Sequence, residues 1–353
     1  MRSPDSRYLH AMFAADAAEE RGNVAAALRA IASVPDDWRG RRLWRPARIE
    51  RLLQLEEFGP LLPRWATSRW LLAQAHHHRG RDQRGRLGRA VATARAVRRA
   101  PGVHHAHLDE DQILDHDWVC WQTHLYDYGG LDRFLRYGAS PELVAAADRV
   151  RQWGHAPMRA LQLVELEPKL LHWRDPSEER VRTINLGAAV LVDKGEWVLG
   201  RVVPIGDDPT PCEAMFESAP LLVPEPVARA VADDPPRWVE ILERGCAQVV
   251  DDPDRHIRTE LFDFSLLSDI PWVLPGLLVE KYGGATALIE HLGLDGLACV
   301  AALLVRPGMS VALGRQSLDS QELRATMHLA ELLPEPAASI LRHAHRSQRE
   351  EVS

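Results

Sequence analysis

The sequence predicts a mainly helical α+β protein, built as a helical hairpin array, a small β barrel or meander in the middle, and C-terminal helices. Two changes of pattern lead to this prediction. Apolar residues recur at helical spacing through residues 1–155, alternate in strand fashion within residues 156–222, and return to helical spacing in residues 223–353. These three ranges are the predicted domains, and a chain of 353 residues can hold them.

The first predicted element is a helical hairpin. Residues 8–21 and 24–31 carry apolar side chains at helical spacing, and Gly22-Asn23 separates them. The run "AADAAEERGNVAAALRAI" resembles a tetratricopeptide-like unit, in which each helix pair buries its apolar face against a neighbour. Further helices are expected in the first domain at residues 46–58, 64–78, 87–99, 109–128, 131–135 and 141–153.

Short strands are expected next. Residues 161–165, 171–173 and 181–185 alternate between apolar and polar side chains, and turn-forming residues separate them. The pattern continues through residues 190–192 and 197–203. About five short strands are too few for a two-sheet sandwich, so they favour a small barrel or a curved meander that protects its edges.

The middle region also resembles a known module. Trp173-Arg174-Asp175 forms an expected turn, and a valine-rich strand runs over residues 195–204. Residues 161–207 thereby resemble a small β module of uncharacterised bacterial proteins, some of which carry the Cys-rich SEC-C zinc motif. The resemblance implies a structural module and no activity, because the cysteine cluster of SEC-C is missing from this sequence.

Helical spacing defines the last third of the chain. Helices are expected there at residues 224–232, 237–246, 272–282, 285–291, 294–304, 321–333 and 337–345. Proline at position 224 suits the first turn of the first of these helices.

Composition narrows the functional classes. The four cysteines are far apart, and no leader segment or long apolar run is present, so we expect a cytoplasmic protein with reduced thiols and no membrane partner. Arginine is abundant and lysine occurs only at positions 169, 194 and 281, which favours a bacterial source. The sequence lacks the G-x-G-x-x-G, Walker, G-x-S-x-G and H-E-x-x-H motifs of common nucleotide-binding proteins and hydrolases. We therefore expect a non-catalytic interaction or scaffold protein that needs no cofactor.

An arginine-rich segment suggests where a partner binds. Residues 39–99 contain sixteen arginines and four acidic residues, although the whole protein has a formal charge of −7. Tryptophans lie among these arginines, a mixture that can bind an acidic protein or, alternatively, stack bases and neutralise phosphates of a nucleic acid. The candidate partner-binding residues are Arg41, Arg42, Arg45, Arg48, Arg69, Trp44 and Trp70. The structural alternative places the arginines on outer helix faces and the tryptophans in the seams between helices.

A histidine-rich segment raises a third functional class, a metal-dependent enzyme. The spacing His105-x-His107-x-Asp109 approximates the H-x-H-x-D-H signature of metallo-β-lactamase-like enzymes, but Glu110 replaces the last histidine. His116 and His124 are two helical turns apart on one face. The candidate ligands for zinc or another transition metal are His105, His107, Asp109, His116 and His124. The structural alternative is a solvated loop that leads into an acidic helix start.

Overall fold

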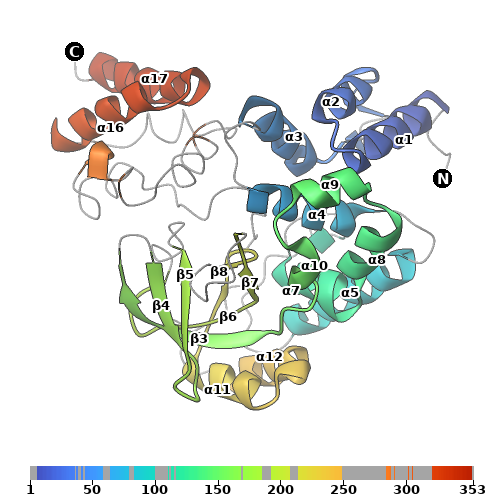
Figure 1. Ribbon diagram of the computed structural model, residues 1–353, viewed down its shortest axis with the longest axis vertical. Coiled ribbons are helices and arrows are strands. Elements are labelled where there is room, and N and C mark those ends of the chain that lie inside the picture. The colour runs from blue at the N-terminus through green and yellow to red at the C-terminus, as the bar shows by residue number, and fades with distance from the viewer. Residues whose placement is uncertain are drawn as a thin grey trace.

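The protein is a mainly helical α+β structure, as predicted (Figure 1). This computed structural model describes residues 6–35, 37–38, 41–42, 44–58, 64–78, 83–99, 110, 113–114, 117–167, 170–184, 192–206, 214–248, 284–287, 290, 301, 304 and 320–351. N-terminal helices and a small antiparallel sheet lie side by side, and two later helices cover the sheet.

The predicted first hairpin is present. Helices α1 (Ser6–Glu20) and α2 (Val24–Ala32) are joined at Gly22, whose φ of +73° is the left-handed conformation that favours glycine. The side chain of Asn23 caps α2 by accepting a hydrogen bond of 3.0 Å from the backbone N–H of Ala26. Buried alanines in both helices let their backbones approach closely.

Helix α4 (Arg64–His77) runs through the centre of the helical half. It is buried on almost every side, and a helix of that kind forms the core of a larger assembly of helices. It contacts α8 (Gly130–Tyr137) and α9 (Pro141–Ala146), which lie far along the chain. Such contacts differ from the neighbour-to-neighbour stacking of a repeat protein, so the predicted hairpin array stays a prediction.

Five more helical elements belong to this half. They are α3 (Pro46–Phe58), α5 (Gln83–Arg99), α7 (Trp118–Gln122), the π-helical turn η2 (Thr123–Asp127) and α10 (Val150–Trp153). Of these, η2 and α10 contact α4. Helix α7 continues directly into η2, where the N–H of Tyr128 donates to the carbonyl of Thr123 at 2.8 Å. This five-residue spacing identifies the wider π-helical turn.

The sheet is antiparallel and has the strand order β5-β4-β3-β6-β9. Its strands are β3 (Arg159–Leu166), β4 (Leu170–Arg174), β5 (Arg180–Ile184), β6 (Trp197–Gly200) and β9 (Leu221–Val223). A separate ribbon pairs β7 (Val202–Pro204) with β8 (Ala214–Phe216), and a short ribbon pairs β1 (Asp37–Trp38) with β2 (Arg41–Arg42).

The sheet curls toward the β7–β8 ribbon without closing into a barrel within the described strands. Strand β5 contacts β8, and Phe216 of β8 packs against Trp173 with ring centroids 5.1 Å apart. The meander of β3, β4 and β5 is thus present, and the closed-barrel form of the prediction is not seen in this part of the chain.

Two helices cover the sheet from below in Figure 1. Helix α11 (Glu225–Asp233) and helix α12 (Trp238–Gln248), which follows the short 3₁₀ turn Pro235–Arg237, share a hydrophobic cluster with β3, β6 and α5. The cluster joins residues from all three predicted domains, and those domain boundaries stay a prediction.

A final helical hairpin consists of α16 (Ser320–Leu332) and α17 (Glu335–Glu351). The helices expected at residues 272–282, 285–291 and 294–304 lie wholly or largely outside the described residues. Across the described helices, none combines the length and apolar character that membrane crossing requires.

Candidate binding pocket

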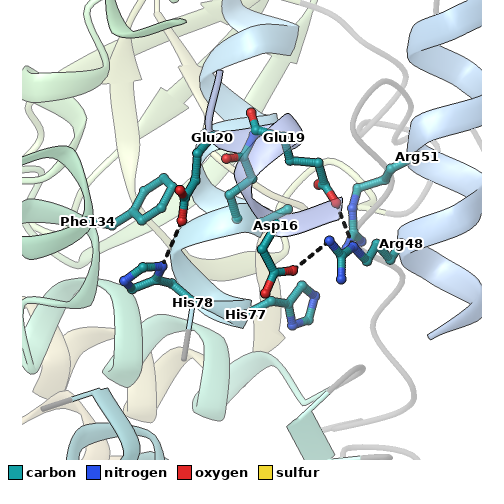
Figure 2. Close-up of a pocket in the computed structure, with 10 residues that line it drawn as sticks. Asp16, Glu19, Glu20, Arg48, Arg51, His77, His78 and Phe134 are labelled. Carbon is teal, nitrogen blue, oxygen red and sulfur yellow. Dashed lines mark hydrogen bonds and ion pairs between the residues drawn. The ribbon is translucent and has the colours of Figure 1, made fainter. Parts of the chain in front are cut away.

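A small, partly open pocket lies where α1, α3, α4 and α8 meet (Figure 2). Charged and polar side chains from α1, α3 and the C-terminal end of α4 converge on it, and Ala73 and Phe134 supply apolar wall. The lining residues are Asp16, Glu19, Glu20, Arg48, Arg51, Ala73, Gln74, His77, His78 and Phe134. The helical spacing of the sequence explains the acidic side of the pocket, because Asp16 and Glu20 are one turn apart on α1.

Arg48 is held by two carboxylates on one side of the pocket. Its Nε donates to Oε1 of Glu19 at 2.5 Å, and a terminal nitrogen donates to Oδ1 of Asp16 at 2.7 Å. Burial lowers the pKa of Arg48, but the two carboxylates outweigh burial and raise that pKa above its ordinary value. Glu19 also accepts from the indole N–H of Trp70, at 3.4 Å, so this ion pair is anchored in the helical core.

Other oxygen atoms in the pocket can accept further hydrogen bonds. The side chains of Asp16 and Glu20 are 42% and 32% exposed, and the contact of Glu20 with Nδ1 of His78 is 3.5 Å long. Gln74 donates from Nε2 to the backbone carbonyl of Glu19 at 3.1 Å. Its buried Oε1 accepts no hydrogen bond from the described residues. The pocket therefore presents carboxylate oxygens and one amide oxygen that can accept further hydrogen bonds.

Three histidines of α4 and η2 lie in or beside the pocket: His77 is half-buried in its lining, and His76 and His124 are buried next to it. Nδ1 of His77 accepts from Arg45 at 3.2 Å, and Nε2 of His76 contacts the carbonyl of Leu114 at 2.8 Å. Nδ1 of His76 lies 3.2 Å from Nδ1 of His124. Because a carbonyl only accepts, a neutral His76 donates from Nε2 and accepts at Nδ1, so His124 donates from Nδ1.

The environment keeps these imidazoles neutral. Burial, followed by neighbouring imidazole and arginine charges, lowers the pKa of His76 well below its ordinary value. Burial and the charges of Arg45 and Arg51 do the same for His77. The pKa of His124 falls to about 4, because of burial and then the charge of Arg86. All three are therefore uncharged at neutral pH.

The structure places the predicted partner-binding residues in several environments. Trp44 and Trp70 are buried, so neither ring is accessible for stacking on a partner. Arg69 is also buried and donates to the carbonyl of Phe216 at 3.0 Å. Arg45 is half-buried against His77, and Arg48 lies in the pocket. The side chains of Arg41 and Arg42 lie outside the described residues.

Other arginines of the basic segment also have internal partners. Arg64 donates to the carbonyls of Ala145 and Ala147 at the end of α9, and Arg86 donates to the carbonyl of Gly129. Arg98 forms a buried ion pair with Asp117. These contacts explain much of the arginine content of this segment by packing within the chain.

Among the predicted metal ligands, only His124 is described; His105, His107, Asp109 and His116 lie outside the described residues. His124 is fully buried against His76. A different group could hold an ion, because one ligand atom each of Glu165, Glu167 and His172 lies within 4.8 Å of the others. Nε2 of His172 is 3.0 Å from Oε1 of Glu167.

Sequence reasoning missed this group because it depends on strand register. Glu165 of β3 lies opposite His172 of β4, directly after an irregularity between Leu163 and Glu165. Alternation of side chains alone does not reveal which residues face each other across two strands. The one feature of the sequence that could have indicated this group is the close spacing of Glu165 and Glu167 before a turn.

A buried polar network joins the helical half to the sheet. Arg201 donates to Oδ1 of Asp127 at 2.6 Å and to Oε1 of Gln122 at 3.0 Å. The indole N–H of Trp238 donates to the other carboxylate oxygen of Asp127 at 2.8 Å. Glu217 accepts from Gln122, and burial raises the pKa of Glu217. These interactions fix the sheet against η2 and α12.

No family model, curated protein or solved structure matches this chain. The chemistry of the pocket is therefore the starting point for a functional proposal.

Proposed function

We propose that this protein is a non-catalytic interaction protein that recognises a charged group of its partner in the pocket between α1, α3, α4 and α8. The observation that carries the proposal is the convergence of charged side chains from α1 and α3 and polar side chains from α4 on one concave site. Pockets that combine apolar wall with a few fixed polar groups are the usual places where proteins bind ligands.

The shifted pKa values favour binding over catalysis. Burial raises the pKa of the Cys120 thiol, which keeps it in the unreactive protonated form. The depressed pKa values of His76, His77 and His124 make these imidazoles poor proton acceptors at neutral pH. These shifts move the groups away from the thiolate and the near-neutral base that acyl-transfer or hydrolytic chemistry needs.

The acidic partner expected from the arginine content stays a prediction. So does the alternative of nucleic-acid binding. The internal contacts of Arg64, Arg69, Arg86 and Arg98 leave fewer described guanidinium groups to bind an acidic surface. The internal contacts of these arginines therefore weaken the case for an acidic partner, and the proposal of an interaction protein rests on the pocket.

A charged-probe panel tests the proposal. Isothermal titration calorimetry of the full chain with an alkyl guanidinium, an alkyl ammonium, inorganic phosphate and a short carboxylate should give saturable binding with at least one probe. Ala73→Leu fills the pocket and should abolish that binding, whereas Ala92→Leu on the exposed face of α5 should leave it unchanged.

A second readout covers the case in which Ala73→Leu fails to fold. The ring-proton signals of His77 and His78, which line the pocket, should shift in the wild-type protein when the probe binds. Absence of binding by every probe, or binding that leaves these signals unmoved, would refute the proposed site.

A further inference from the structure

We infer that the group recognised in this pocket is an organic cation with N–H donors, an ammonium or a guanidinium. This inference rests on the proposed function and names the chemistry of its ligand. Three features of the pocket carry it: the balance of charge, the unused acceptors and the aromatic wall.

Among the carboxylate and guanidinium groups of the lining, negative charge exceeds positive charge. Asp16, Glu19 and Glu20 face Arg48 and Arg51, so the carboxylates outnumber the guanidinium groups by one. The neutral His77 adds no positive charge. Asp16 and Glu20 are also one turn apart on α1, where two like charges destabilise a helix unless a cation lies near both.

The unused hydrogen-bonding atoms are acceptors. Gln74 is only 7% exposed, and its Oε1 receives no hydrogen bond from the described residues. Rotating the amide would not satisfy it, because the amide nitrogen is needed to donate to the carbonyl of Glu19. A buried polar atom without a partner costs free energy, so a ligand that brings a donor gains from this site.

The carboxylates of Asp16 and Glu20 also have oxygen atoms that can accept further hydrogen bonds. Asp16 uses Oδ1 for Arg48, and the carboxylate of Glu20 has, among the described side chains, the 3.5 Å contact with His78. A carboxylate ligand has no donor for any of these oxygens, and a phosphate brings its few O–H donors together with further negative charge. It would also have to compete with Asp16 and Glu19 for Arg48. An ammonium or guanidinium can donate to several of these atoms at once.

Phe134 completes the site with an apolar wall. Figure 2 shows its ring beside Glu20 and His78, and its centroid lies 5.2 Å from that of the His78 imidazole. An aromatic face attracts a cation and packs against the methylene stem that carries it. The combination of acids, an amide oxygen and an aromatic ring suits the end of an arginine or lysine side chain, or a small alkyl guanidinium.

Calorimetry with matched probes tests this chemistry at about 50 mM salt, where charge interactions are only partly screened. The probes are agmatine, a blocked arginine tripeptide, the same tripeptide with uncharged citrulline, and the same tripeptide with glutamate. We expect the arginine tripeptide to bind at least about tenfold more tightly than the citrulline tripeptide. If agmatine binds as tightly as the tripeptide, the ligand is a small cation. If the tripeptide binds more tightly, the source is a protein side chain.

Charge-removing variants locate the binding. Asp16→Asn and Glu20→Gln should each weaken arginine binding by about tenfold. Glu142→Gln on the exposed start of α9 should leave it unchanged. Binding of the glutamate tripeptide in preference to arginine, strengthened by Glu20→Gln, would overturn the cationic inference while the proposed binding function stands. Failure of all charged probes to bind would overturn both.

Discussion

The buried imidazole of His124 makes the stability of the protein depend on pH. His124 has a folded-state pKa of about 4, and an imidazole in an unfolded chain titrates near 6.5. Between these two values the unfolded chain binds a proton that the folded protein does not bind. The free energy of unfolding therefore falls as the pH is lowered through this window. The contribution of the neutral His124 to that free energy is fully present above the unfolded-state pKa.

The size of this effect follows from the shift. A difference of about 2.5 pKa units corresponds to a maximum of about 3 kcal/mol of unfolding free energy from His124, reached near pH 4. The imidazole is fully buried beside His76, so solvent screening does not reduce this figure strongly. The lowered pKa values of His76 and His77 act in the same direction.

His124→Asn tests this linkage. The asparagine amide nitrogen can replace Nδ1 as a donor to His76, but it does not titrate. Urea unfolding followed by tryptophan fluorescence at pH 7.0, 6.0, 5.0 and 4.5 gives the unfolding free energy of both proteins.

The comparison between the two proteins isolates His124 from other groups that titrate in acid. We expect the variant to be less stable than wild type at pH 7. Its disadvantage should shrink by about 2–3 kcal/mol at pH 4.5. His10→Asn on the exposed face of α1 serves as the control and should give a constant difference. A constant difference for His124→Asn would refute the reasoning.

Three other predictions follow from close contacts and charges. Gly130→Ala should destabilise the protein by about 1–3 kcal/mol in thermal melts, because a Cβ there would lie 2.6 Å from the backbone oxygen of His124; unchanged melting would contradict the packing. Arg98→Met should cost about 3–5 kcal/mol in urea unfolding by leaving Asp117 charged and buried, and the double variant with Asp117→Asn should recover part of that loss. Fluorescence anisotropy with labelled single-stranded RNA at about 50 and 200 mM salt should show weak binding with a shallow salt slope, since many basic side chains have internal partners; a steep slope would favour the nucleic-acid alternative.

Local patterns in the sequence were sufficient to predict the main elements. Apolar spacing and the Gly22-Asn23 turn predicted the first hairpin, and alternation predicted the meander of β3, β4 and β5. These features depend on neighbouring residues, so a pattern within a short window is enough. The curl of the sheet without closure was not predictable, because it depends on contacts between β5 and β8, which are separated along the chain.

The pocket required tertiary information. Arg48 was identified as a binding residue for its charge, but its carboxylate partners come from a different helix. Trp70 was assigned to the same surface and instead donates to Glu19 from within the core. A single sequence shows which residues are charged, and it does not show which of those charges meet when helices pack.

The π-helical turn η2 sets a requirement on chain length. The single residue inserted in this turn rotates the following side chains by about 100°; His124 contacts His76 of α4, and Asp127 contacts Arg201 and Trp238. Removing one residue from positions 123–127 would restore an ordinary α-helical register and rotate one of these two contacts out of place. A substitution in this turn changes one side chain and its contacts, whereas a single-residue deletion would break a connection between the helical half and the sheet.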